Sequence, residues 1–213
     1  MAIVPRSKWG AKPARSRTAR DPKALKGVVV HWFGSPRGAK VHDGCPGILR
    51  SVQSAHMRGE YTDIAYNHAV CPHGTVYELR GFGVQSGANG TRRANREYAA
   101  VVVMIGRGDP FTARARTSLR RTIADWRRHG AGRMVVPHGA ITGSECPGEE
   151  IRAWLDARLY DQPKPKKPKP GPVRVDVDGP AILTNQSTEN PALWKRLRLW
   201  AKARKPFTVK PRD

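Results

Sequence analysis

The sequence predicts an α/β domain in which helices flank a central mixed β-sheet, followed by a basic C-terminal appendage. Two observations predict the domain. The sequence contains apolar β-branched runs typical of buried strands, and segments of helical periodicity alternate with these runs. A third observation predicts the appendage, since the composition changes sharply after Asp161 to a run rich in proline and lysine. We therefore expect a folded domain over residues 1–161, a linker over 162–172 and a short basic region over 173–213.

Five segments have the pattern of β-strands. Their β-branched and apolar residues are bounded by glycine, proline and polar residues, as strands usually are. Three of them are continuous apolar runs that we expect to be buried: residues 27–32, 99–105 and 134–136. The other two flank the turn sequence Pro72-His73-Gly74 and therefore predict a hairpin: residues 65–70 and 75–79.

Three segments carry apolar residues at helical spacing, and a glycine follows two of them as a natural C-terminal stop. In chain order, the apolar faces are Ile48, Leu49, Val52 and His56; Leu119, Thr122, Ile123 and Trp126; and Ile151, Trp154, Leu155 and Leu159. Glu149 and Glu150 favour the start of the third helix, because carboxylates stabilise the positive end of a helix dipole.

The net charge of the chain indicates that its binding partner is negatively charged. Among 213 residues there are 39 lysines and arginines but only 17 acidic residues, which gives a formal net charge of +22. So cationic a surface attracts polyanions such as nucleic acid, anionic lipid or an anionic cell-wall polymer. No segment approaches the roughly 18 consecutive apolar residues of a membrane span, and no apolar signal-peptide region opens the sequence. We expect a soluble chain that is synthesised in the cytoplasm.

The residues after Asp161 have their own character. Residues 162–172 read QPKPKKPKPGP, which predicts an extended, semi-rigid polyproline linker. Residues 191–205 have the pattern of a basic amphipathic helix. Such a helix either lies on an anionic membrane or wall polymer, or docks its apolar face on a folded part of the chain.

The three cysteines are Cys45, Cys71 and Cys146. Because their number is odd, at least one thiol is left for another task, and Cys146 is the candidate. We expect Cys45 and Cys71 to be buried as small hydrophobic residues. A bridge between them would require an oxidising compartment.

His31, His138 and Cys146 form the candidate site. His31 ends one apolar run, His138 follows another, and Cys146 lies in the loop before the third predicted helix. This placement allows the three side chains to meet at one end of the sheet. Two imidazoles and one thiolate suit Zn²⁺, and a zinc ion held by three protein groups keeps its fourth position for water, as in hydrolytic sites. The pattern predicts a zinc hydrolase.

Several sequence blocks extend this interpretation: IVPRSKWGA at 3–11, VVVH at 28–31, SVQSAHM at 51–57, DIAYN at 63–67, GTVYELRG at 74–81, and His138 followed by CPG at 146–148. In this order they resemble the N-acetylmuramoyl-L-alanine amidases of the type-2 amidase and peptidoglycan-recognition-protein family, particularly bacteriophage endolysins. The resemblance covers nearly all of residues 1–161. A second triplet, Cys45-Pro46-Gly47, lacks the counterpart of His138 eight positions upstream and is expected to be a decoy.

The resemblance implies hydrolysis of the amide between N-acetylmuramic acid and L-alanine in bacterial peptidoglycan, with lysis of a bacterial host as the biological role. It implies that His31, His138 and Cys146 bind Zn²⁺, which lowers the pKa of its water from ~15.7 toward ~7. It also implies that Tyr66 points into the cleft, where its hydroxyl can stabilise an oxyanion. Some relatives carry lysine or threonine two residues before the ligating cysteine; this chain has Ser144. We assign Ser144 to oxyanion support and leave the general acid open.

The remaining histidines are expected to have other roles. His56 falls on a buried helix face, so a core or supporting role is expected there rather than metal binding. Strand alternation places His68 on the same face as Tyr66, which predicts a position lining the cleft. His42, His73 and His129 lie in loop or helix-end contexts, where solvent exposure is expected.

Peptidoglycan is the expected partner, and the protein is expected to act on the bacterial wall as a monomer. The basic C-terminal region would add contacts to anionic wall polymers or a membrane surface. No zinc-finger spacing or ribonucleoprotein motif supports a specific nucleic-acid partner. Two alternatives stay open: a non-catalytic peptidoglycan-binding protein, and a thiol hydrolase with Cys146 as the nucleophile.

Overall fold

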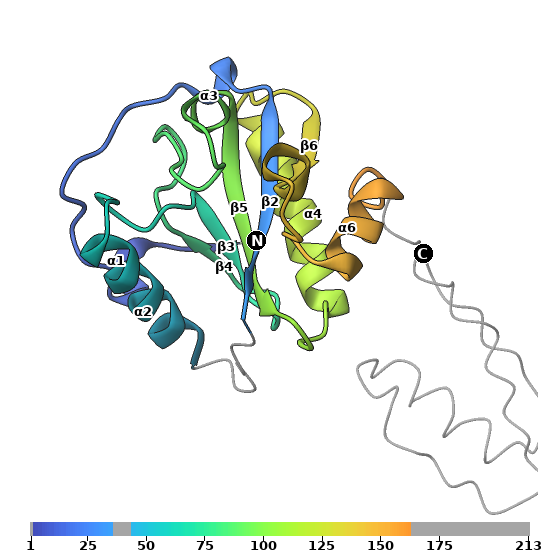
Figure 1. Ribbon diagram of the computed structural model, residues 1–213, viewed down its shortest axis with the longest axis horizontal. Coiled ribbons are helices and arrows are strands. Elements are labelled where there is room, and N and C mark those ends of the chain that lie inside the picture. Colours follow the sequence, from blue (N-terminus) through green and yellow to red (C-terminus); the bar gives the residue numbers. More distant parts are fainter. Residues whose placement is uncertain (1, 36–43, 163–213) are drawn as a thin grey trace, which may run out of the picture. The chain divides into compact units, whose positions relative to one another are not determined.

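The computed structural model describes residues 2–35 and 44–162 (Figure 1). The linker expected over 162–172, apart from Gln162, and the basic region expected over 173–213 lie outside the described residues. The same holds for His42 and for the amphipathic helix expected over 191–205.

The described residues form a six-stranded sheet with the order β1-β4-β3-β5-β2-β6. The strands are β1 (Ile3–Val4), β2 (Gly27–Gly34), β3 (His68–Val70), β4 (Val76–Glu78), β5 (Tyr98–Gly106) and β6 (Met134–Pro137). Only β3 and β4 pair antiparallel, through the predicted hairpin, and the other neighbours in this sheet pair parallel. The predicted mixed sheet is therefore confirmed.

Helices cover both faces of the sheet. On one side lie α1 (Arg6–Trp9) and α2 (Gly44–Arg58), and on the other lie α4 (Ala113–Arg128) and α6 (Glu149–Asp156) (Figure 1). Shorter segments complete the described chain: a 3₁₀ turn (Pro22–Ala24), α3 (Arg92–Glu97) and α5 (Gly139–Thr142). The three longer helices are those that apolar periodicity predicts, whereas α1, α3 and α5 are too short to show a period.

The central strand β5 separates two apolar clusters. Val101, Val103 and Ile105 pack with Leu119 and other residues of α4 and α6. Val102 and Met104 alternate with them and pack on the opposite side, in a cluster that includes residues of α1 and α2. Both faces of the strand are thus buried, which explains its continuous apolar run. Full burial of each of these larger side chains contributes ~1.5–3 kcal/mol to folding.

Two expectations about this sheet are corrected. Strand β6 was expected to be buried, but it is an edge strand and Met134 is 50% exposed. His68 was expected to line the cleft with Tyr66, but its ring is buried against Phe82 and Trp126. Alternation does not connect the two residues, because β3 begins at His68 and Tyr66 lies in the irregular segment before it.

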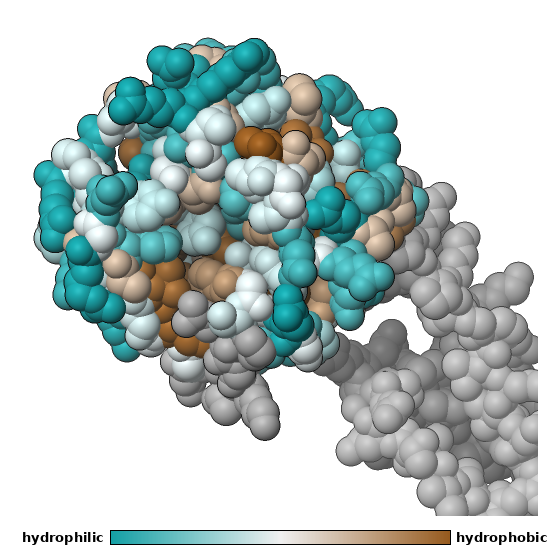
Figure 2. Space-filling model, viewed as in Figure 1, coloured by the Kyte–Doolittle hydropathy of each residue, from teal (hydrophilic) through white to brown (hydrophobic). Residues whose placement is uncertain are grey.

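Hydrophilic side chains cover most of the face drawn in Figure 2, and apolar side chains interrupt it only in separate areas. None of the helices within residues 2–35 and 44–162 is both long and apolar enough to cross a bilayer.

Candidate metal centre

The sheet brings His31 and His138 together. His31 lies in β2 opposite Val102 of β5, and Val30 beside it pairs with Pro137 of β6. The backbone N–H of His138 donates to the carbonyl of Val30 at 3.1 Å, so His138 continues the register of β6 next to His31. Two histidines 107 positions apart (138 − 31) therefore become neighbours across adjacent parallel strands.

The loop between α5 and α6 adds Cys146. The backbone N–H of Gly139 donates to the carbonyl of Cys146 at 2.6 Å, which folds the loop back on the start of α5. A Cβ at position 139 would lie 2.1 Å from the carbonyl oxygen of Ser144 and 2.7 Å from that of Cys146. Only glycine permits this close approach. The backbone N–H of Trp32 also hydrogen-bonds the cysteine sulfur.

The three predicted ligands converge. One ligand atom from each of His31, His138 and Cys146 lies within 4.8 Å of the other two. The Sγ atom of Cys146 is 3.9 Å from Nδ1 of His31, and the two imidazole centroids are 4.3 Å apart. Ligand atoms around a tetrahedral zinc ion lie about 3.3–3.6 Å apart, as Zn–N and Zn–S bond lengths require. Small side-chain adjustments would bring the three groups to those separations.

Asn89 fixes the orientation of His31. Its Oδ1 atom lies 2.9 Å from Nε2 of His31. Its Nδ2 atom donates to Oγ of Ser86 and to the carbonyls of Ala94 and Tyr98, so the amide oxygen is the atom that faces the imidazole. Nε2 of His31 is therefore the protonated nitrogen, and Nδ1 carries the lone pair that faces Cys146. This hydrogen bond selects the tautomer that a metal ligand needs.

Sequence reasoning missed Asn89. The Oδ1 atom of Asn95 accepts the backbone N–H of Asn89 at 2.8 Å and so supports the turn that holds it. The turn before α3, which contains Asn89, has no periodic pattern, so the sequence carried no signal for this residue.

Burial sets the protonation of all three side chains. Desolvation, with a smaller effect of the His138 imidazole, lowers the pKa of His31 to about 3. Desolvation also lowers the pKa of His138, and it raises the pKa of the Cys146 thiol to about 11. Both imidazoles are consequently neutral at pH 7, as ligation requires. A coordinated metal deprotonates a thiol outright, and this effect offsets the rise in the pKa of Cys146 that burial causes.

The donor set fits a zinc ion. It joins two neutral imidazoles and one thiol, a combination suited to borderline-soft Zn²⁺. The Nε2 atom of His138 is buried and has no hydrogen-bond partner among the described residues. Buried polar atoms of this kind are rare in folded proteins and indicate a missing ion or water.

Tyr66 and Ser144 line the same pocket, which has a volume of about 270 Å³. The ring of Tyr66 meets that of His31 edge-on at a centroid distance of 5.3 Å. Ser144 is exposed, and its Oγ atom lies 2.9 Å from the hydroxyl of Thr142. The structure thus brings both predicted catalytic residues to the rim of the candidate centre, with the tyrosine ring in direct contact with a predicted ligand.

His56 has a supporting position, as expected from its helix face. Its Nδ1 atom accepts the backbone N–H of Ala65 at 3.1 Å, and its ring lies 5.8 Å from that of Tyr66. Glu145 forms an exposed ion pair with Arg107 at 2.6 Å.

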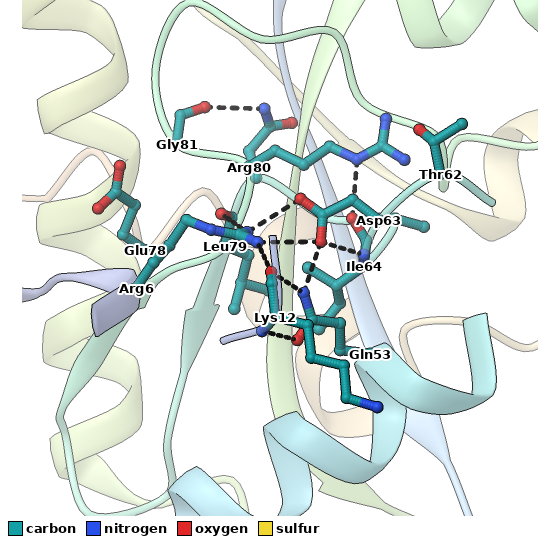
Figure 3. Close-up of polar contacts among 12 residues, drawn as sticks. Arg6, Lys12, Gln53, Thr62, Asp63, Ile64, Glu78, Leu79, Arg80 and Gly81 are labelled. Carbon is teal, nitrogen blue, oxygen red and sulfur yellow. Dashed lines mark hydrogen bonds and ion pairs between the residues drawn. The ribbon is translucent and has the colours of Figure 1, made fainter. Parts of the chain in front are cut away.

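A buried polar network holds the segment that leads to Tyr66 (Figure 3). The carboxylate of Asp63 accepts hydrogen bonds from the side-chain amide of Gln53 and from the backbone N–H of Ile64, both at 2.8 Å. It also forms an ion pair with Arg6 at 3.0 Å. Arg6 also donates to the carbonyl of Leu79, so the network joins α1, α2 and the segment after β4. Arg80 donates to the carbonyl of Ile64 at 2.7 Å from the other side.

Two larger pockets adjoin the metal-centre pocket through Trp32, which lines all three. Their volumes are about 610 Å³ and 840 Å³, and both are also lined by Arg107 and Glu145. The candidate centre therefore adjoins two further pockets that could receive parts of a larger ligand.

Known proteins with similar sequences share this fold. No protein-family model matches the sequence. Peptidoglycan-recognition protein SC2 of Drosophila simulans is 28% identical over 162 residues, which cover 72% of this chain and 86% of that protein. Peptidoglycan-recognition protein SC1a of Drosophila melanogaster is 25% identical over 162 residues, which cover 71% and 85%.

Solved structures give the same result. Wild-type Drosophila PGRP-LB superposes with a TM-score of 0.66 at 22% identity, covering 78% of this chain and 99% of that one. PGRP-LE in complex with tracheal cytotoxin, a monomeric diaminopimelic acid-type peptidoglycan, superposes with a TM-score of 0.63 at 27% identity, covering 72% and 94%. The fold implied by the sequence blocks is thereby confirmed.

Proposed function

We propose that this chain, which has the type-2 amidase fold of its peptidoglycan-recognition-protein homologues, is a zinc-dependent N-acetylmuramoyl-L-alanine amidase. The observation that supports the proposal is the approach of ligand atoms from His31, His138 and Cys146 to within 4.8 Å of one another, beside Tyr66. The complex of PGRP-LE with a peptidoglycan fragment supports peptidoglycan as the partner.

His31 through Nδ1, His138 and Cys146 would hold the ion. When bound, zinc supplies a Lewis acid and a water of lowered pKa at neutral pH. Asn89 keeps the ligating nitrogen of His31 unprotonated, because its amide oxygen accepts a hydrogen bond from the N–H group at Nε2. Burial keeps both imidazoles neutral, so protons do not compete for the ligating nitrogens at pH 7.

The remaining groups act on the substrate. The scissile amide joins the lactyl carbonyl of N-acetylmuramic acid to L-alanine, and cleavage develops negative charge on that carbonyl oxygen. The hydroxyl of Tyr66 donates a hydrogen bond to this oxygen, an effect worth ~3 kcal/mol for a well-placed donor. Ser144 contributes a second, weaker donor at the pocket rim, and the pockets lined by Trp32 receive the glycan or stem peptide.

The proposed biological role is lysis of a bacterial host by a bacteriophage endolysin. In this role the protein is made in the host cytoplasm and acts on the wall as a monomer. Its net charge of +22 concentrates it on anionic wall polymers, and the basic region over 173–213 adds contacts to the wall or a membrane surface.

Digestion of purified peptidoglycan tests the proposal. Mass spectrometry of the products should find new L-alanine amino termini together with glycan strands of unchanged length. New reducing ends or cleaved peptide cross-links would contradict the assigned bond. Binding without any cleavage by the zinc-loaded protein would leave a non-catalytic recognition protein. Full activity after exhaustive chelation would instead favour Cys146 as a nucleophile.

A further inference from the structure

A second cluster of metal-binding side chains lies where α2 contacts the β3–β4 hairpin. Cys45 belongs to the first turn of α2, Cys71 follows β3 directly, and His73 lies in the turn before β4. Both cysteines are fully buried free thiols, as the sequence predicts. His73 was expected to be solvent-exposed, but it is only partly exposed and faces the two sulfur atoms.

The three side chains point at a common centre. Nδ1 of His73 lies 3.0 Å from Sγ of Cys71 and 3.6 Å from Sγ of Cys45. One ligand atom from each residue lies within 4.8 Å of the other two, as in the first cluster. Around a tetrahedral zinc ion, nitrogen and sulfur ligands lie about 3.6 Å apart. The separations are therefore already close to those of a coordinated ion.

The hairpin turn creates this arrangement. The backbone N–H of Cys71 donates to the carbonyl of Thr75, and that of Gly74 donates to the carbonyl of Cys71, each at 2.9 Å. Gly74 has a φ of +94°, a conformation that glycine adopts without strain. The resulting tight turn carries the imidazole of His73 back over Cys71, where the backbone N–H of His73 also hydrogen-bonds the sulfur.

The surroundings stabilise negative charge on one sulfur of the pair. A hydrogen bond from Cys45 and further hydrogen bonds from His73 outweigh desolvation and lower the pKa of Cys71 to about 6. The same hydrogen bond, together with burial, raises the pKa of Cys45, so Cys71 ionises first. Thiolates are the form in which cysteine binds metals.

We propose that Cys45, Cys71 and His73 form a second zinc site, which fastens helix α2 to the β3–β4 hairpin. The ion takes two thiolates and one neutral imidazole, with water in the fourth position on the side of the partly exposed His73. Binding releases to solvent the protons that the sulfur atoms still hold. The site shares no residue with the cluster of His31, His138 and Cys146, so it stands whether or not that cluster is catalytic.

Metal content of the full chain tests this proposal. Wild type, Cys71→Ser, His73→Asn, Cys146→Ser and the double variant Cys71→Ser/Cys146→Ser are dialysed against excess Zn²⁺, freed of unbound ion and analysed by elemental mass spectrometry. We expect two zinc ions per wild-type chain, one in Cys146→Ser, one in Cys71→Ser and none in the double variant. His73→Asn, which keeps both buried sulfur atoms, should bind the second ion at least tenfold more weakly.

Substitution of Co²⁺ gives an independent measurement. In the Cys146→Ser protein, cobalt should show near-ultraviolet absorption from cobalt–thiolate bonds, and chelation should lower the thermal midpoint of this variant but not of the double variant. The proposal is overturned if Cys146→Ser binds no zinc, or if mass spectrometry of the non-reduced protein finds Cys45 and Cys71 joined as a disulfide. One ion in both wild type and Cys146→Ser would instead support this site and contradict the proposed catalytic one.

Discussion

The Nε2 atom of His31 lies 2.9 Å from Oδ1 of Asn89, a fully buried side chain 58 positions further along the chain. This hydrogen bond determines which imidazole nitrogen faces Cys146 and His138. The proposed metal centre thus depends on a residue outside the ligand set.

Substitution Asn89→Ala should weaken zinc binding at the catalytic centre by about 10–100-fold, the usual loss when a partner of a ligating histidine is removed. The variant loses control of the His31 tautomer but keeps all three ligands. Competition with a chelating dye measures the affinity, in a Cys71→Ser background that removes the second proposed site. Ser144→Ala is the matched control, because Ser144 lines the same pocket and its hydroxyl hydrogen-bonds that of Thr142; equal affinities for the two variants would contradict the role of Asn89.

Substitution Tyr66→Phe should keep the metal but lose about 10²–10³-fold in turnover, because it removes one hydroxyl donor from the developing oxyanion. The tyrosine ring packs edge-on against His31, and phenylalanine preserves that contact. Release of L-alanine amino termini from peptidoglycan measures the rate, and elemental analysis measures zinc. A variant with wild-type turnover would show that the hydroxyl takes no part in catalysis.

Substitution Arg6→Ala should lower the free energy of unfolding by about 3 kcal/mol, because it leaves the carboxylate of Asp63 buried without its ion-pair partner. The side chain of Arg6 is only 14% exposed and that of Asp63 1%. Urea denaturation measures the change. Arg93→Ala provides the control, since it breaks an exposed ion pair with Glu97 and should have little effect. Equal losses in the two variants would contradict a structural role for the network in Figure 3.

His68 should make the folded protein sensitive to acid. Burial, with a smaller effect of His129, lowers the pKa of His68 from an ordinary 6.5 to about 3. Above pH 6.5 both folded and unfolded chains carry neutral His68, so its burial has no pH-dependent cost there. As the pH falls from 6.5 toward 3, only the unfolded chain gains the proton, and stability falls by up to about 1.4 kcal/mol per pH unit.

The variant His68→Leu isolates this effect. It replaces the imidazole with an apolar side chain that cannot take up a proton, at the position packed against Phe82 and Trp126. Denaturation at a series of pH values should give a shallower loss of stability between pH 6.5 and 4 than in wild type. Parallel curves for the two proteins would mean that His68 is protonated equally in the folded and unfolded states.

Much of this fold was predictable because its longer elements carry periodic patterns. The apolar run of β5 and the stripe of Leu119, Ile123 and Trp126 in α4 each reveal which element they form and which face they bury. His31 and His138 were predictable as neighbours because parallel strands bring their ends together. Periodicity does not tell whether a strand lies in the middle or at the edge of the sheet. This is why β6 was wrongly expected to be buried.

Contacts between irregular segments were not predictable. Asn89 lies in a turn without a repeating pattern, and its partner His31 is brought to it only by the packing of the whole sheet. Cys45 and His73 meet because α2 lies against the hairpin, a relationship that strand and helix patterns leave open. Alternation failed for His68 because the regular strand begins there and does not extend back to Tyr66.

Crystals of the zinc-loaded full chain, measured on both sides of the zinc absorption edge, test the central claim most directly. The account predicts an anomalous peak about 2.0–2.3 Å from Nδ1 of His31, a ring nitrogen of His138 and Sγ of Cys146. The absence of a peak at that point, in crystals grown with saturating Zn²⁺, would contradict the proposed catalytic centre.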